Sequence, residues 1–259
     1  MKWKKWIFLV ATGLLVLGLA GCGKAEKVTQ HSGKLTIGLE GTYAPFGYRD
    51  KTGNLTGYDV EVSKAIAKKM GLKPEFKPTG WDSLIAGLNS NTYDVVFNNM
   101  AVTKERKQKF RMADPYVYSK AVIITKDNSD IKTVDDIKGK RFGEGTGTDN
   151  WKIAEKYGAK VFSGPQFETA MEMIQQGRMD GAINAEPAFN AWAKSHPNSG
   201  LTAHVIPSDK VEEEAIAPLM NKNSAELNKK MNKAIKELRK DGTLKRLSVK
   251  YFGSDITNR

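Results

Sequence analysis

Residues 81–98 read WDSLIAGLNSNTYDVVFN, and residues 167–184 read FETAMEMIQQGRMDGAIN. Each stretch begins with an aromatic residue, continues as a helix-like run, carries an Asp thirteen positions after the aromatic residue, and ends in a short apolar strand closed by Asn. This duplication predicts two similar lobes. In an open α/β sheet, ligands bind beyond the carboxyl ends of the strands, so we expect Asn98 and Asn184 to face a shared crevice between the lobes.

Strand and helix patterns alternate on both sides of these stretches, which predicts an α/β fold with largely parallel sheets covered by helices on both faces. We expect lobe 1 to comprise residues 34–124 and 214–259, and lobe 2 to comprise residues 125–213. The chain then crosses between the lobes twice, near Thr125 and within residues 207–217. Two crossings form a hinge with one principal closing motion.

The first 21 residues have the pattern of a secretion signal, with an early cluster of lysines, an apolar run over residues 6–19, and small residues before Cys22. The apolar run is too short for a comfortable transmembrane span. Residues 22–33 are small and polar, which suits a flexible tether of roughly 20 Å. Cys22 is the only cysteine, so the exported domain forms no internal disulfide.

The chain carries a net charge of +12, and removal of the three signal lysines leaves 38 Lys and Arg against 29 Asp and Glu, or +9. The lysines are spread over helix faces such as residues 229–240 and are not interleaved with aromatic residues, which argues against a nucleic-acid partner. A basic surface beside anionic lipid or wall polymer is the more economical interpretation. His31, His196 and His204 are scattered, so the sequence predicts no metal site, no catalytic triad and no cofactor.

An ordered set of motifs resembles the polar amino-acid solute-binding proteins of ABC importers, solute-binding protein family 3. The motifs are EGTYAPF at 40–46, GYDVE at 57–61, YDVV at 93–96, TKER at 103–106, Gly147-Thr148, KDGTL at 240–244 and YFG at 251–253. The resemblance implies a two-lobed, type II periplasmic-binding-protein fold with two hinge segments. It also implies a monomer without enzyme activity that closes around one free amino acid and delivers it to a membrane permease.

The quartet Leu-Ala-Gly-Cys at 19–22 resembles the lipobox of bacterial lipoproteins, in which the cysteine is diacylated. By this resemblance, Cys22 is a lipid anchor that holds the domain on the outer side of the cell membrane. The alternative is an ordinary secreted protein whose cysteine happens to lie beside the cleavage site.

By the same resemblance, Arg106 grips the α-carboxylate of the ligand, and a guanidinium suits this role because it forms two parallel hydrogen bonds. The alternative interpretation is that Arg106 is an exposed member of the charged run 104–109. The glycine-rich loop that ends in Gly147 and Thr148 opens a helix, so we expect free N–H groups of Thr148 and Asp149 to receive the second carboxylate oxygen. A phosphate loop is excluded because no Gly-Lys-Ser/Thr ending follows.

Three aromatic residues, Tyr43, Phe46 and Trp81, are expected to form walls that stack on the apolar part of the ligand and face its ammonium group. Tyr43 and Phe46 lie in a loop after a strand, where the family places its ligand platform. Trp81 fits helix-to-sheet packing equally well.

The α-ammonium group needs a carboxylate, and here the chain departs from the family pattern. Many relatives have an Asp at the position of Ala185. The sequence favours Glu186 as the replacement, although Glu186 also fits as a first-turn acid of the helix that it begins. The open alternatives are Asn184, or carbonyl groups near Asn98 and Ala101 together with Glu40.

Among relatives, the resemblance is closest to the cystine-binding branch, judged from residues 42–46, 78–82 and 252–255. Cystine is doubly zwitterionic, so Arg106 at one end and an acid such as Glu40 toward the other are compatible with it. Glutamine, arginine and histidine fit almost as well. Two other classes of function stay open at this point, an exported enzyme on the same scaffold that resembles cyclohexadienyl or arogenate dehydratases, and a surface adhesin or signalling domain.

Overall fold

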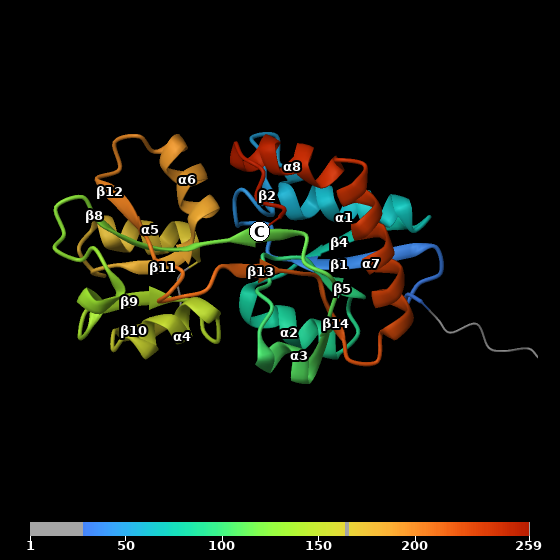
Figure 1. The fold of residues 1–259 in the computed structure, drawn as a ribbon, viewed down its shortest axis with the longest axis horizontal. Helices are drawn as coiled ribbons and strands as arrows, with labels where there is room; N and C mark the ends of the chain where they lie inside the picture. Colours follow the sequence, from blue (N-terminus) through green and yellow to red (C-terminus); the bar gives the residue numbers. More distant parts are fainter. Residues whose placement is uncertain (1–27, 164–165, 259) are drawn as a thin grey trace, which may run out of the picture.

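A computed structural model describes residues 28–163 and 166–258. The predicted secretion signal and Cys22 lie outside these residues. Figure 1 shows two lobes side by side, joined by extended segments that cross between them. Within the described residues, no helix is both long and apolar enough to cross a membrane.

The sheet of lobe 1 has five strands, in the order β4 (Lys73–Pro78), β1 (Lys34–Leu39), β5 (Val95–Val96), β14 (Leu219–Asn221) and β6 (Phe110–Met112). β1 pairs in parallel with β4 and with β5, as the alternating pattern predicts. β14 returns antiparallel to β5 and to β6. A short hairpin of β2 (Tyr48–Arg49) and β3 (Leu55–Thr56) lies outside the sheet.

Three helices pack together over one face of this sheet, namely α1 (Tyr58–Lys69), α7 (Ala225–Lys240) and α8 (Thr243–Phe252). Their apolar sides bury Ile66, Met231 and Leu244 against Leu35 and Ile37 of β1. The last two helices therefore belong to lobe 1, as predicted. Below the sheet in Figure 1 lie α2 (Trp81–Asn89), which has its own apolar cluster with the strands, and α3 (Lys104–Lys109).

Lobe 2 is built on the antiparallel strands β11 (Ala182–Ala185), β8 (Ala121–Lys126) and β12 (Leu201–Val205). A parallel pair, β9 (Arg141–Glu144) and β10 (Lys160–Ser163), joins this sheet through a parallel bridge between Phe142 and Gly181. The predicted parallel arrangement is therefore wrong for the centre of lobe 2. The helices of lobe 2 pack in two separate apolar clusters. One cluster contains residues of α5 (Phe167–Gln175) and α6 (Glu186–Ser195). The other contains residues of α4 (Asp149–Lys156) and of the 3-10 turn η1 (Val134–Ile137).

The boundary between the lobes lies earlier in the chain than the sequence predicts. β8 is hydrogen-bonded to β11 on one side and to β12 on the other, so lobe 2 begins at Ala121 and not at residue 125. The continuous apolar run of β8 suits this central position, because both faces of the strand are covered.

Two paired strands form the hinge. β7 (Val117–Ser119) and β13 (Glu214–Ile216) run antiparallel, with Ser119 opposite Glu214 and Val117 opposite Ile216. The chain thus crosses between the lobes twice, as predicted, and the two crossings are hydrogen-bonded to each other.

The duplicated Asp has the same structural role in both lobes. Asp94 accepts hydrogen bonds from the backbone N–H and the hydroxyl of Thr36 on β1, at 2.7 and 2.5 Å. Asp180 accepts from the backbone N–H of Arg141 on β9 at 2.7 Å and pairs with the Arg141 guanidinium at 2.6 Å. Each Asp therefore fixes the start of the repeat's strand to the neighbouring strand.

The prediction of a flexible tether over residues 22–33 is wrong for its described part, residues 28–33. The N–H of Gln30 donates to Asp94 at 2.7 Å, its side chain donates to the carbonyl of Tyr93 at 3.1 Å, and Thr29 is buried. The segment from Val28 onward is therefore attached to lobe 1, because the buried carboxylate of Asp94 has a further acceptor site to satisfy.

Candidate ligand-binding site

A cavity of about 350 Å³ lies between the lobes and has the size of a small-molecule site. Both Asn98 and Asn184 line it, so the predicted crevice at the ends of the duplicated strands is confirmed. The aromatic residues that open the two repeats, Trp81 and Phe167, line it as well. Charged residues from both lobes complete the lining, namely Glu40, Asp82 and Arg106 from lobe 1 and Glu144 and Asp149 from lobe 2.

Arg106 reaches the cavity from α3. Thr103 caps this short helix by accepting the backbone N–H of Arg106 at 3.1 Å. The guanidinium Nη1 donates to the carbonyl of Ala101 at 2.8 Å and to the carboxylate of Asp149, across the cleft, at 2.5 Å. Ala101 thus faces Arg106 and does not line the cavity.

The glycine-rich loop leads into α4, as predicted. Gly147 has a φ of 70°, which a residue with a side chain rarely adopts, and it shapes the turn without lining the cavity. Thr148 caps α4 by accepting the N–H of Trp151 at 3.1 Å.

Contrary to the prediction, the N–H of Thr148 is not free, because it donates to the carbonyl of Gly145 at 3.1 Å. The N–H groups of the following residues, Asp149 and Asn150, lie in the first turn of α4 and have no acceptor within the helix. The positive end of the helix therefore reaches the cavity one residue later than the sequence indicates.

The three predicted aromatic walls have different positions. Trp81 and Tyr43 line the cavity and also join the lobes, because the indole N–H donates to the carbonyl of Thr146 at 2.9 Å and the Tyr43 hydroxyl donates to Asn184 at 2.5 Å. Phe46 lies beneath Tyr43, is 1 % exposed, and packs in the apolar cluster of lobe 2. The prediction that Phe46 forms a cavity wall is not supported by this buried position.

Glu186, the predicted partner for the ligand ammonium, lies outside the cavity. The chain turns into α6 directly after β11, where the N–H of Glu186 donates to the carbonyl of Lys120 at 2.8 Å. This turn directs Glu186 to a separate groove between α6 and α8. The geometry therefore places Glu186 away from the other predicted site residues.

Glu144 is a cavity residue that the sequence analysis missed. It ends β9, is only 3 % exposed, and its Oε1 accepts the N–H of Ile183 on β11 at 2.6 Å. Burial raises the pKa of Glu144 well above its ordinary value. One available signal was its place at the end of a predicted strand, directly before the glycine-rich loop.

On the lobe 1 side, Glu40 and Asn98 form a reciprocal pair. The N–H of Glu40 donates to the Asn98 side chain at 2.9 Å, and the Asn98 amide donates back to the Glu40 carboxylate at 2.7 Å. Burial raises the pKa of Glu40, and the hydrogen bond from Asn98 partly offsets this effect. The pair holds an acidic group in the cavity, so Asn98 acts here by positioning Glu40.

Glu214 of the hinge strand β13 is a second acidic residue that sequence reasoning missed. Burial and, to a smaller extent, the nearby Asp149 raise its pKa to about 7, and Arg106 partly opposes this increase. Arg106 therefore has two acidic neighbours, Asp149 and Glu214. No cluster of His, Cys, Asp or Glu that could hold a metal ion occurs in the part of the chain that the structure describes.

The lobes are in contact across the cleft. Besides the bonds of Arg106, Tyr43 and Trp81, an ion pair joins Glu105 of α3 to Lys152 of α4. These contacts hold lobe 1 and lobe 2 in a closed arrangement.

Comparisons with known proteins agree with this geometry. The sequence profile of the bacterial extracellular solute-binding proteins, family 3, matches residues 35–254. The L-cystine-binding protein TcyA of Bacillus subtilis is 43% identical over 227 residues, which cover 87% of this chain and 83% of TcyA.

Two solved structures bear on the lobe arrangement. An ancestral arginine-binding protein bound to arginine is 36% identical and superimposes with a TM-score of 0.77, covering 85% of this chain and 99% of that protein. The L-cystine solute receptor of Neisseria gonorrhoeae, unliganded and open, is 39% identical but superimposes with a TM-score of only 0.61, covering 87% of this chain and 95% of the receptor. The better match to the ligand-bound protein, despite its lower identity, agrees with closed lobes.

The family profile, the identity of the relatives and the two-lobed architecture all lead to one assignment. The resemblance noted in the sequence and the predicted fold class are both confirmed. The chain belongs to the bacterial extracellular solute-binding proteins, family 3.

Proposed function

We propose that the protein binds one free amino acid between its lobes, outside the cytoplasm, and delivers it to an ABC importer. L-Cystine is the first candidate, because TcyA is named for cystine binding and covers most of this chain. Other polar amino acids are the second choice, since an arginine-bound protein is also a close structural neighbour. In this proposal the protein is a monomer, is anchored to the membrane by a lipid on Cys22, and hands its ligand to permease subunits.

The observation that carries the proposal is the meeting of Arg106 and the start of α4 across the cavity. A carboxylate, that of Asp149, already lies 2.5 Å from the Arg106 guanidinium. An amino-acid carboxylate that replaced it would receive the same charge-assisted hydrogen bonds, together with the free N–H groups of the first helical turn. Closed lobes exclude water and so strengthen these contacts.

We further propose that Glu144 binds the α-ammonium group. Its carboxylate lies against the N–H of Ile183, two residues before Ala185, the position at which the family resemblance implies an Asp. In this proposal the acidic group for the ammonium is Glu144 of strand β9, which takes the place of an Asp at position 185. Its second oxygen, Oε2, forms no hydrogen bond with any described residue, and no described cation offsets its charge. A ligand ammonium would supply the missing positive partner.

Glu40 is proposed to bind a second cationic group at the other end of the ligand. Its carboxylate is held in the cavity by Asn98 and comes from lobe 1, whereas Glu144 comes from lobe 2. Two acids on opposite lobes suit a ligand with two separate amino groups, such as cystine.

The alternative of an enzyme on this scaffold is not supported, because the family and its named relatives are solute-binding proteins. No observation on the described residues favours an adhesin.

The test is a thermal-shift screen of the protein from residue 23 onward against all proteinogenic amino acids and L-cystine. This chain keeps every residue of the four apolar clusters that build the lobes. We expect one ligand, or a few related ligands, to raise the melting temperature, since ligand binding to the native state alone stabilises it. A flat response to the whole panel would contradict amino-acid binding.

A further inference from the structure

The charge of this protein is divided unequally between its lobes. Lobe 1, over residues 28–120 and 214–258, has 24 Lys and Arg against 14 Asp and Glu, a net charge of +10. Lobe 2, over residues 121–213, has 11 against 14, a net charge of −3. The excess positive charge of the mature chain therefore lies entirely on the lobe that carries the N-terminus.

Most of this charge lies on the three helices that cover one face of the lobe 1 sheet. α1, α7 and α8 contain 12 Lys and Arg against 4 Asp and Glu, and one of these acids, Asp59, is fully buried. The apolar sides of the helices are packed on the sheet, so the basic residues face outward. We call the unpaired exposed cations of these helices the basic face: Lys68, Lys229, Lys230, Lys233, Lys236, Lys240, Lys245, Arg246 and Lys250.

On α7 the basic face is a regular stripe. Lys229, Lys233, Lys236 and Lys240 follow one another at spacings of four, three and four residues, which places them on one side of the helix. The buried residues of α7, such as Met231, lie on the opposite side. The stripe is therefore directed away from the core, toward the surroundings of the protein.

The cations of the basic face have no ion-pair partners among residues 28–163 and 166–258. Neighbouring Lys64 and Lys69, by contrast, pair with Glu61 and Asp241. Like charges four residues apart destabilise a helix. The α7 stripe is thus an arrangement that an external anionic surface would stabilise.

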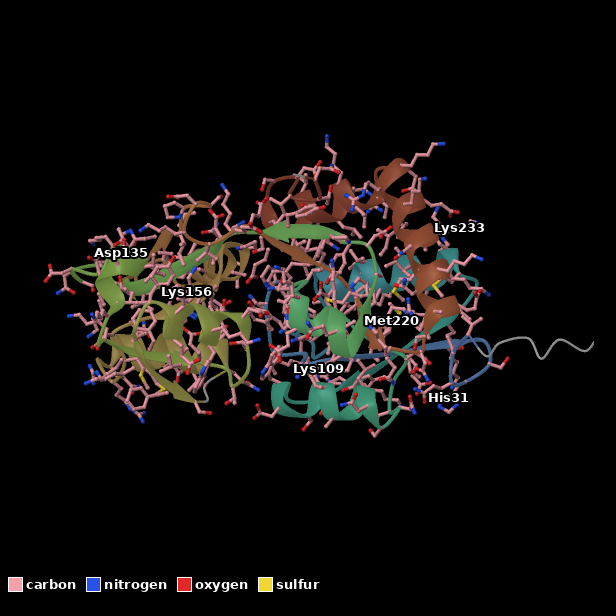
Figure 2. All side chains as sticks on the ribbon, turned by 60° about the horizontal axis from the view of Figure 1, so that its bottom comes forward. His31, Lys109, Asp135, Lys156, Met220 and Lys233 are labelled. Carbon is pink, nitrogen blue, oxygen red and sulfur yellow. The ribbon has the colours of Figure 1, made fainter. Side chains whose placement is uncertain are left out.

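The start of the described chain lies beside α7. Val28 to His31 share a groove with Asn223 to Leu227, the segment that leads into this helix. In Figure 1, α7 runs along the outer edge of lobe 1, beside the blue start of the described chain. Figure 2 shows Lys233 at this edge and Lys156 in the opposite lobe.

The distance to a membrane anchor is short. Five residues lie between Cys22 and Val28, the first attached residue, so the two are at most ~20 Å apart when this segment is fully extended. The lipid anchor, which is part of the proposed function, would hold α7 close to the membrane surface. Charges in solution are largely screened beyond the Debye length, which is about 8 Å at physiological salt. A basic face held near the bilayer therefore lies close enough to interact with the charge of the lipid headgroups.

We propose that the basic face docks on anionic phospholipid headgroups of the membrane. Docking holds lobe 1 against the bilayer, while the acidic lobe 2 is repelled from the surface and stays free to open and close. The occupant is lipid and not a nucleic acid, because the stripe has one sign of charge without the stacking aromatics that single-stranded nucleic acids require, and because the family is extracellular.

The experiment measures sedimentation of the unlipidated protein, from residue 23 onward, with vesicles of equal parts phosphatidylcholine and phosphatidylglycerol. Pure phosphatidylcholine vesicles are the reference. The test variant is the triple charge reversal Lys229→Glu, Lys233→Glu, Lys236→Glu. The control is Lys132→Glu, Lys138→Glu, Lys160→Glu, which makes the same change of charge at exposed, unpaired positions of lobe 2.

We expect the wild type and the control to sediment with the anionic vesicles, to dissociate from them in high salt, and not to bind the neutral vesicles. Each basic residue near an anionic surface contributes about fivefold to partitioning, so the α7 variant should bind roughly 100-fold more weakly. Unchanged melting temperatures of both variants show that folding is intact. Amino-acid binding is not part of this assay, so its outcome is independent of the proposed function.

Three results would overturn the proposal. The first is failure of the wild type to sediment with anionic vesicles, and the second is a loss of binding by the lobe 2 control as large as that of the α7 variant. The third result is tighter binding to a soluble poly(glycerol phosphate) than to vesicles at equal phosphate concentration, which would assign the face to wall polymer.

Discussion

The guanidinium of Arg106 on lobe 1 lies 2.5 Å from the carboxylate of Asp149 on lobe 2. The residue proposed to bind the ligand carboxylate is thus occupied by a carboxylate of the protein itself. The same contact joins the lobes, so a ligand carboxylate would compete with Asp149 for the guanidinium.

Replacement Asp149→Asn removes this competing charge while keeping the shape of the side chain. The ligand carboxylate then meets a free guanidinium, and a hydrogen bond to a charged group contributes about 1.5–3 kcal/mol. We expect at least a tenfold gain in affinity for the amino acid found in the screen, measured by isothermal calorimetry. Small-angle scattering should show a larger radius of gyration for the ligand-free variant. Weaker binding would instead assign Asp149 to direct ligand contact.

Replacement Arg106→Ala tests the carboxylate grip itself. Removal of one partner of a buried charge pair costs about 2–5 kcal/mol of binding free energy. Calorimetry should therefore show a loss of that size. Lys107→Ala is the matched control, because Lys107 follows on the same helix and is exposed. Equal affinity of the Arg106 variant and the control would remove Arg106 from the site.

Replacement Glu144→Gln tests the ammonium partner through proton release. Burial raises the pKa of Glu144, and an incoming ammonium group would favour the ionised form and so lower this pKa. Binding by the wild type should therefore release a proton. Calorimetry in buffers of different ionisation enthalpy measures this release.

We expect the Glu144→Gln variant to bind more weakly and to release no proton from this position. Glu155→Gln, on the exposed side of α4 in the same lobe, serves as the control. A variant that binds less tightly but releases the same number of protons would show that Glu144 has only a structural role.

The stability of the protein should depend on pH through Glu214. Its pKa is about 7 in the folded protein and near 4.5 in the unfolded chain, so the folded state binds more protons between these values. The free energy of unfolding therefore falls as pH rises through this window, by at most about 3 kcal/mol for this residue. Urea unfolding should show a flatter pH profile for Glu214→Gln, whereas the exposed Glu212→Gln should keep the wild-type profile. Identical profiles for Glu214→Gln and wild type would contradict the prediction.

The sequence predicts much of the fold because the duplicated pattern is local. The Asp of each repeat, its aromatic residue and its closing Asn lie at equivalent places in both lobes, and the strand ends meet as expected. The predicted lobe boundary, residue 125, lies too late in the chain because the apolar run 121–126 fits a strand of either lobe. Only its pairing with β11 and β12 assigns it to lobe 2.

The candidate site was predictable where a motif fixes the backbone. Arg106 follows a helix cap, and Thr148 follows a glycine-rich turn, so local sequence places both at the cleft. Phe46 and Glu186 were misplaced because the direction of a side chain depends on the neighbouring element. Glu144 was missed for the same reason, since its position beside Ile183 depends on two strands that are far apart in the chain.

The hydrogen-bonded pair of hinge strands, β7 and β13, has a practical consequence. Because both crossings bend together, one angle describes most of the movement between the lobes. Two labels, one on each lobe, therefore report this movement wherever they are placed. A donor dye on α2 and an acceptor dye on α5 would turn this protein into an optical sensor whose signal follows the concentration of its ligand.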